Sequence, residues 1–144
     1  LIKSGVNVAL GTDGAASNNS LDPLADLKLA SILQKCHTGD PTALPAYEAL
    51  KLVTVNGSLA QGREKESGRI APGLDADLIM LDLRTPRQTA AIDPAAAAVY
   101  SCTGRDVELT MCQGRILYER GEYKTIDIER AMFEAKACVK ELGI

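Results

Sequence analysis

The chain has 144 residues, of which 46% are hydrophobic and 24% are charged, and its formal net charge is -3. This length suits one ordinary domain, and the composition is typical of a soluble globular protein. Basic and acidic residues alternate, and the only aromatic residues are one Phe and four Tyr, so we expect no nucleic-acid partner. No apolar run approaches the roughly 18 residues of a membrane span, so we expect a cytoplasmic protein without a membrane partner.

The chain begins at Leu1 without an initiator methionine, and we interpret it as a fragment or a processed product. Its four cysteines are scattered without a Cys-x-x-Cys spacing, whereas small disulfide scaffolds have a denser pattern. We therefore expect reduced, mostly buried thiols with no metal or redox role. These cysteines are Cys36, Cys102, Cys112 and Cys138.

The first predicted element is a short buried strand over Val6–Leu10, which leads into the polar sequence Gly11–Asn19. This strand would end by presenting Asp13 on a glycine-flanked turn. The tip of a parallel strand is where barrel and open-sheet enzymes hold catalytic side chains and metal ligands. Asp-Gly is also among the commonest turn dipeptides, so a purely structural role for Asp13 stays open at this point.

Two helices are predicted next. The pair Asp22–Pro23 is typical of a helix start, and Gly39–Pro41 is typical of a helix end. A second helix begins at Pro45, is broken or bent at Asn56–Gly57, and continues as a short piece to Ala60.

From Arg63 onward the pattern changes to short β-type runs, and this is the predicted domain boundary. The run Asp77–Asp82 predicts a fully buried strand. Two further runs, Val107–Cys112 and Arg115–Tyr118, flank Gln113–Gly114 and predict a tight antiparallel hairpin. A further turn is expected at residues 120–122.

The last predicted element is a helix that Asp127 caps and Gly143 ends. Its acidic residues Glu129, Glu134 and Glu141 are interpreted as a solvated face. Its opposite face is one apolar stripe, made of Ile128, Met132, Ala135, Val139 and Leu142.

The sequence Gly11–Asn19, followed by Leu21–Asp22 and a helix, resembles the loop after the eighth barrel strand in the amidohydrolase superfamily. It most resembles the chlorohydrolase-like branch that contains 5-methylthioadenosine and S-adenosylhomocysteine deaminases. The resemblance continues in order from about Gly5 to Gly121. Further similar segments are Pro41–Pro45, Glu48–Leu50, Thr54–Gly57 and Gly68–Leu78.

This resemblance implies an α/β fold, namely the C-terminal fragment of a TIM-barrel metal-dependent hydrolase. Residues 1–62 would hold the last barrel strand and the following helices. Residues 63–126 would form part of a small composite β-sandwich domain, and residues 127–144 a C-terminal helix. A complete barrel takes roughly 250 residues, so this chain cannot contain one.

The resemblance also implies a zinc-dependent or other divalent-metal hydrolase that deaminates a purine nucleoside such as 5-methylthioadenosine or S-adenosylhomocysteine. Asp13 would bind the metal and handle the proton of the metal-bound water, whose pKa a cation lowers to ~7. The family's histidine ligands would lie upstream of Leu1. Because one carboxylate cannot hold zinc, we expect the isolated chain to be inactive and metal-free.

The neighbouring residues Ser17, Asn18 and Asn19 either orient Asp13 or line the mouth of the site, or they only satisfy the turn backbone and prepare the helix that starts at Asp22. His37 lies at the expected end of the first helix, where exposure or a dipole interaction explains it better than a ligand role. An acidic cluster that flanks a predicted strand is expected to be structural, because a cation site needs more convergent oxygen ligands. Its members are Asp75, Asp77 and Asp82.

Two other functions stay open. A non-catalytic association or oligomerisation domain would use exposed strand edges and apolar helix faces, and a homo-oligomer is expected. A phosphate- or nucleotide-binding module would use the backbone amides around Gly11–Gly14. This loop lacks a basic residue, and its glycine spacing fits neither a P-loop nor a dinucleotide fingerprint.

Overall fold

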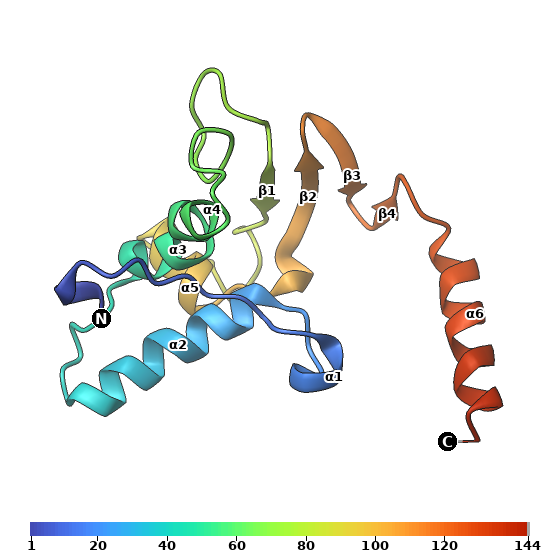
Figure 1. Ribbon diagram of the computed structural model, residues 1–144, viewed down its shortest axis with the longest axis horizontal. Coiled ribbons are helices and arrows are strands. Elements are labelled where there is room, and N and C mark those ends of the chain that lie inside the picture. Colours follow the sequence, from blue (N-terminus) through green and yellow to red (C-terminus); the bar gives the residue numbers. More distant parts are fainter. Residues whose placement is uncertain (144) are drawn as a thin grey trace.

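The computed structural model of the chain describes residues 1–143, so the last residue of the predicted segment 127–144, Ile144, lies outside the described residues. Figure 1 shows a group of helices, a sheet beside it, and one helix that stands apart. The helical part comprises the 3-10 turn η1 (Ile2–Ser4), α1 (Ala15–Asn18), α2 (Pro23–Thr38), α3 (Ala46–Val53), α4 (Val55–Ala60) and α5 (Pro94–Tyr100). The rest comprises β1 (Leu78–Leu81), the 3-10 turn η2 (Gly104–Asp106), β2 (Val107–Cys112), β3 (Arg115–Glu119), β4 (Glu122–Tyr123) and α6 (Ile128–Glu141).

Helix α2 begins and ends where the sequence predicts. The Asp22 Oδ1 atom accepts hydrogen bonds from the backbone N–H groups of Leu24 (3.1 Å) and Ala25 (3.3 Å), and Pro23 is the first helical residue. These bonds satisfy two of the amides that have no partner within the helix. The helix ends at Gly39, whose φ of 66° is the left-handed conformation that glycine adopts without strain.

The break after α3 lies earlier than predicted. It occurs at Thr54, with φ -122° and ψ -101°, whereas Asn56 and Gly57 lie inside α4. The Thr54 hydroxyl donates to the carbonyl of Leu50 at 2.8 Å, a local side-chain bond of the kind that bends helices. The prediction of a break at Asn56–Gly57 is therefore wrong.

The core of the helical part is formed by α2, α3 and α5. Leu27, Ala49 and Val99, one from each helix, are fully buried against one another. The buried hydroxyl of Ser31 in α2 donates to the Leu44 carbonyl (3.1 Å) and lies 2.9 Å from the hydroxyl of Tyr100 in α5. Helix α5 therefore packs with the N-terminal helices, although it lies between β1 and β2 in the sequence.

The sheet is antiparallel throughout, with strand order β1-β2-β3-β4. The predicted β2–β3 hairpin is confirmed, with φ of 48° at Gln113 and 77° at Gly114. Positive φ at both central residues is the geometry that matches the twist of paired strands. The predicted turn after β3 is also confirmed, with φ of 46° at Arg120 and 89° at Gly121.

The buried strand predicted over Val6–Leu10 is wrong. These residues form an irregular segment, and the Val6 side chain is 51% exposed. A strand requires a partner about 4.8 Å away, and the described residues place none beside this segment. It is tethered instead to α3 and α4: the Leu10 N–H donates to the Leu52 carbonyl at 3.0 Å, and the Asn56 side chain donates to the Val8 carbonyl at 2.9 Å.

The strand predicted over Asp77–Asp82 exists as β1, but the prediction that it is fully buried is wrong. Ile79 is 50% exposed and Met80 is 49% exposed. Strand β1 lies at one edge of the sheet and pairs only with β2. Because successive strand residues point to opposite faces, exposure of both side chains means that neither face of the sheet is fully covered here.

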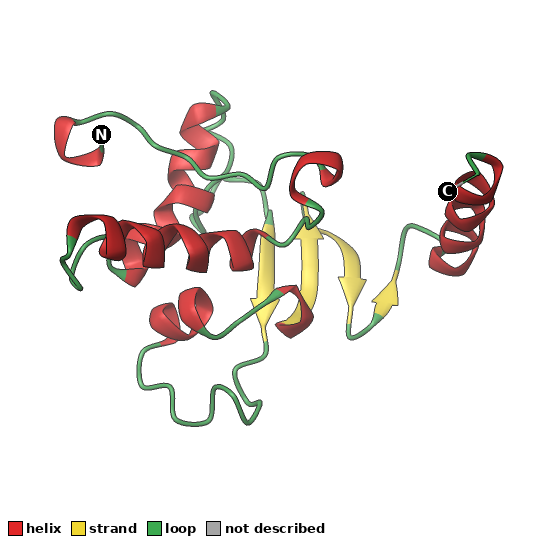
Figure 2. Cartoon of the chain, turned by 90° about the horizontal axis from the view of Figure 1, so that it is seen from below, coloured by secondary structure: helices red, strands yellow, loops and turns green. Residues whose placement is uncertain are grey.

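Helix α6 begins at the predicted cap, where the Asp127 carboxylate accepts from the Arg130 N–H at 3.0 Å. None of its described residues is buried, and its Phe133 side chain is 73% exposed. Figures 1 and 2 both show α6 apart from the helical part and the sheet. Its apolar stripe therefore has no partner among the described residues, and no described helix is long and apolar enough to cross a membrane.

The thiols do not follow the predicted pattern. All four cysteines are free, but only Cys102 is buried, so the prediction of mostly buried thiols is wrong. Burial raises the pKa of the Cys102 thiol, and a hydrogen bond with Asp77 raises the pKa of the Cys112 thiol. The exposed cysteines are Cys36, Cys112 and Cys138.

The helical part and the sheet are joined by a hydrogen bond between residues 82 positions apart in sequence. The Asp22 Oδ2 atom accepts from the Gly104 N–H at 2.9 Å, in the turn that leads into β2. The same carboxylate thus caps α2 with one oxygen and holds the entry to the sheet with the other.

We expect Asp22→Ala to lower the free energy of unfolding by about 2 kcal/mol, because it removes an N-cap and leaves the Gly104 amide without its partner. Asp127→Ala is the matched control, since Asp127 caps α6, a helix of which no described residue is buried. It should change the main transition by less than about 0.5 kcal/mol. Urea unfolding followed by circular dichroism measures both, and equal losses would contradict the joining role of Asp22.

Candidate functional site

Asp13 lies in an exposed loop between the irregular N-terminal segment and α1. Its φ of 59° is the left-handed conformation, which Asp tolerates better than most residues. The Gly14 N–H donates to Asp13 Oδ1 at 2.7 Å, and the Thr12 hydroxyl donates to the Asp13 carbonyl at 3.1 Å. The loop therefore fixes the carboxylate through one oxygen, while Oδ2 has no hydrogen-bond partner among the described residues.

Asn18 connects the Asp13 loop to α2. Its side-chain amide donates to the Thr12 carbonyl at 2.9 Å and to Asp26 Oδ2 at 3.0 Å. The carbonyl of Thr12 belongs to the peptide bond that leads into Asp13. Asp26 is a residue that the sequence reasoning missed, since an acidic residue in the first turn of a helix has an ordinary explanation in the helix dipole.

Ser17 and Asn19 act through their backbones. The Ser17 N–H donates to the Gly14 carbonyl at 3.0 Å, and the Asn19 N–H donates to the Ala15 carbonyl at 2.9 Å. Asn19 has a φ of 58° and ends α1. Of the three polar residues predicted around Asp13, Asn18 is thus the one whose side chain reaches a neighbour of Asp13.

The donor set does not by itself fit a metal ion. In the part of the chain that the structure describes, no three His, Cys, Asp or Glu side chains converge on one point. A catalytic zinc takes three protein ligands as a rule, and the Asp13 loop offers one carboxylate. His37 is exposed in the last turn of α2, whereas Asn18 joins the Asp13 loop to the first turn of that helix.

The acidic cluster predicted to be structural has local ion-pair partners. Asp75 and Asp77 lie 3.3 Å and 3.9 Å from the Arg63 guanidinium. The Arg84 side chain donates to Asp82 at 2.9 Å and holds the pKa of that carboxyl below its usual range. These ion pairs stabilise the segments on either side of β1, and none of them involves the Asp13 loop.

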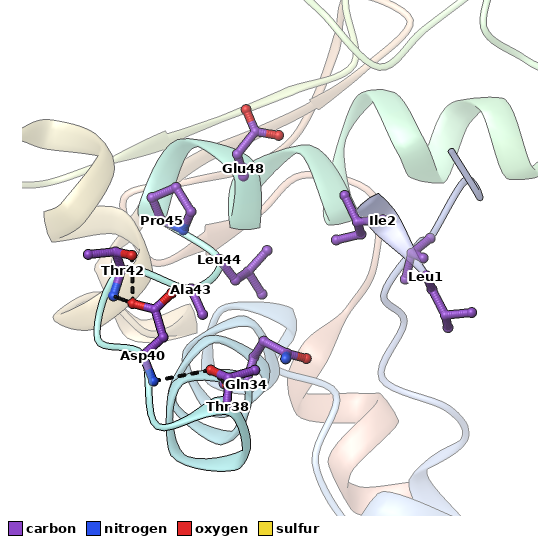
Figure 3. A pocket seen from close by; sticks show the side chains of 11 residues that line it. Leu1, Ile2, Gln34, Thr38, Asp40, Thr42, Ala43, Leu44, Pro45 and Glu48 are labelled. Atoms are coloured by element: carbon purple, nitrogen blue, oxygen red, sulfur yellow. Dashed lines mark hydrogen bonds between the residues drawn. The ribbon is translucent and has the colours of Figure 1, made fainter. Parts of the chain in front are cut away.

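A hollow of about 770 Å³ lies at the opposite end of α2 from the Asp13 loop. It is formed by η1, the C-terminal end of α2, the α2–α3 loop and the start of α3 (Figure 3). Leu1 and Ile2 lie across this hollow from Asp40 and Thr42. Because α2 has 16 residues and is about 24 Å long, the hollow and Asp13 belong to different places in the fold.

A sequence profile of the amidohydrolase family matches residues 1–117, which include the Asp13 loop and most of the sheet. The 5-methylthioadenosine/S-adenosylhomocysteine deaminase of Moorella thermoacetica is 48% identical over 90% of this chain. The 5'-deoxyadenosine deaminase of Methanothermobacter thermautotrophicus is 46% identical over 99% of it. The chain covers only 30% and 33% of the lengths of these two relatives.

Solved structures agree with this similarity. A zinc-bound adenosine deaminase from Xanthomonas campestris superposes on 98% of this chain with a TM-score of 0.94 and 30% sequence identity. An atrazine chlorohydrolase from Arthrobacter aurescens, in complex with zinc, covers 94% of the chain with a TM-score of 0.82 and 28% identity. The chain covers 32% and 30% of these two structures.

The left-handed conformation of Asp13 determines how its substitutions should change the free energy of unfolding. We expect Asp13→Ala to lower the free energy of unfolding by about 1 kcal/mol, because alanine is strained at this φ and cannot accept from the Gly14 N–H. Asp13→Asn should stay within about 0.5 kcal/mol, since asparagine tolerates the conformation and keeps an acceptor. Asp13→Gly is the control that removes the carboxylate and the strain together. Urea unfolding compares the three, and a loss for glycine larger than for alanine would contradict the left-handed assignment.

Proposed function

Because the chain belongs to the amidohydrolase family, we propose that it is part of a metal-dependent hydrolase that removes the amino group of an adenosine derivative. The family assignment confirms the resemblance predicted from the Asp13 loop. The proposed substrate class rests on the similarity to two relatives that are named as deaminases of such compounds and are 48% and 46% identical to this chain. In this reaction water adds at the ring carbon that bears the amino group, ammonia leaves, and a carbonyl group remains.

Asp13 contributes one carboxylate to the divalent-metal site of this enzyme, and the other ligands come from residues outside this chain. Zinc is the candidate metal, because two similar enzyme structures carry it. The held Oδ1 and unpartnered Oδ2 of Asp13 support this role, since a ligand must be fixed and still have a free lone pair. Asn18 orients the Asp13 loop through its side-chain amide, and Ser17 and Asn19 line the mouth of the site beside the purine nucleoside.

In the longer protein, Val6–Leu10 takes the place of the last strand of a TIM barrel. Support comes from the order of the elements, because this segment precedes the helices α1 to α4 and the sheet follows them. Residues 63–126 contribute to a small β domain and residues 127–144 form its C-terminal helix. A cytoplasmic location stays a prediction.

The alternative is a domain that works by association, as a homo-oligomer. The observation that favours it is the number of large apolar side chains left in solvent, including Phe133 at 73% and Val139 at 51% exposure on α6. Exposed apolar faces of this kind mark interaction surfaces. In the proposed enzyme the same faces contact the rest of the longer chain or a second copy.

A chimaera tests the enzymatic proposal. The matching segment of the Moorella thermoacetica deaminase is replaced by this chain, and ammonia release from 5'-methylthioadenosine is measured. We expect an active enzyme in which Asp13→Asn lowers kcat by about 10³-fold, because asparagine keeps the backbone but cannot take up a proton.

Asp93→Asn is the matched control for this chimaera, because Asp93 is also a loop carboxylate but caps α5. Its activity should equal that of the unaltered chimaera. A folded but inactive chimaera, or full activity with Asp13→Asn, would contradict the proposal.

The number of metal ligands in the isolated chain predicts how much zinc it retains. The isolated 144-residue chain should retain less than one zinc per ten chains after dialysis, on the order expected when one carboxylate competes with water and buffer. The chimaera should retain stoichiometric zinc. Elemental analysis of both proteins measures this, and one zinc per isolated chain would show that the chain holds a complete site.

A further inference from the structure

We infer that Asp26 is a positioning residue for the Asp13 loop and acts through the side-chain amide of Asn18. The inference rests on the proposed role of Asp13, because a positioning residue matters to a reaction only if the group that it positions takes part. The hydrogen bonds themselves are properties of the chain and do not depend on that role.

Both N–H donors of the Asn18 side-chain amide are used in this arrangement. A side-chain amide nitrogen carries two N–H donors, and here it meets one acceptor on each side, the Thr12 carbonyl at 2.9 Å and Asp26 Oδ2 at 3.0 Å. The bond to Asp26 is charge-assisted and therefore stronger than a bond between neutral groups. It holds the amide in the orientation that also reaches Thr12, directly before Asp13.

Helix α2 supplies the fixed point. Leu24 and Leu27, on either side of Asp26 in the sequence, are 6% and 0% exposed, so this turn of the helix is anchored in the core. The loop has no such anchor of its own, since Asp13 to Ser17 are all exposed. A left-handed φ at Asp13 persists only where the surroundings hold it, and the bond from Asn18 to Asp26 provides that restraint.

Asp26 has a simpler explanation, namely that it stabilises the positive end of α2. The two explanations differ in what they require of Asn18. A helix-end charge acts whether Asn18 is present or not, whereas a positioning role is lost once the Asn18 amide is gone. Asp22 already caps this helix, so the cap bonds remain when Asp26 is replaced.

A double-mutant cycle in the chimaera decides between these explanations. If Asp26 acts through Asn18, Asp26→Ala and Asn18→Ala each lower kcat about tenfold with KM changed less than about twofold, as for groups that orient a ligand. The double variant is then no slower than the slower single variant, because both changes remove the same restraint. Asp26→Asn, which keeps an acceptor oxygen, recovers kcat to within about threefold of the unaltered chimaera.

Glu129→Ala is the matched control, because Glu129 is also a first-turn carboxylate but belongs to α6. Its kcat should be that of the unaltered chimaera. Losses that multiply in the double variant, or an Asp26→Asn variant as slow as Asp26→Ala, would overturn the positioning role.

Amide hydrogen exchange in the 144-residue chain separates this inference from the proposed function. The N–H groups of Ser17, Asn18 and Asn19 are hydrogen-bonded within the loop, and Asp26→Ala should speed their exchange about fivefold or more relative to Glu129→Ala. Unchanged exchange overturns the positioning role, whatever the activity. Faster exchange together with an inactive unaltered chimaera supports the restraint and contradicts the proposed function alone.

Discussion

The carboxylate of Asp22 joins parts of the chain that lie far apart in the sequence. One oxygen accepts from the first amides of α2, and the other accepts from the Gly104 N–H at the entry to β2. Asp26 lies one turn further along the same helix and holds the loop that carries Asp13, through Asn18. The loop, the helix and the sheet therefore share one fixed reference, the N-terminal end of α2.

This arrangement explains how one carboxylate can be held precisely on an exposed loop. The fully buried core of the helical part is small, with Leu27, Ala49 and Val99 at its centre, but it lies along α2 and fixes that helix. Polar side chains at the end of α2 then carry the restraint outward to the loop. In the proposed enzyme the accuracy of the Asp13 position derives from this packed helix together with the bond from the Gly14 N–H.

In the proposed enzyme one fact explains both the incomplete metal-ligand set and the exposed apolar surfaces. The chain covers about a third of the length of its curated relatives. In the proposed enzyme the other two thirds of the protein supply the missing ligands and cover the apolar surfaces. Within residues 1–143, one oxygen of Asp13 has no partner, one edge of β1 is unpaired, and the apolar stripe of α6 faces solvent. The fold of this segment nevertheless matches that of the zinc-bound relative closely, with a TM-score of 0.94.

The elements whose cause is local can be predicted from the order of the residues alone. Each of these elements depends on residues within four positions of one another, so a short window of sequence predicts it. They are the start of α2 at Asp22, the start of α6 at Asp127 and the hairpin turn at Gln113–Gly114. The left-handed conformation at Asp13 is likewise stabilised locally, by the bond from the Gly14 N–H, and the family resemblance rests on the contiguous string around it.

Which groups meet across the chain depends on how distant segments pack together. The fold leaves Val6–Leu10 without a strand partner, exposes Ile79 and Met80, and gives the second oxygen of Asp22 to Gly104. The fold also brings Asp26 within hydrogen-bond distance of Asn18. The sequence does not predict this bond, because an acidic residue at a helix start is already explained by the helix dipole. Burial and hydrogen-bond partnership depend on which segments come together in space, and no window of neighbouring residues contains that information.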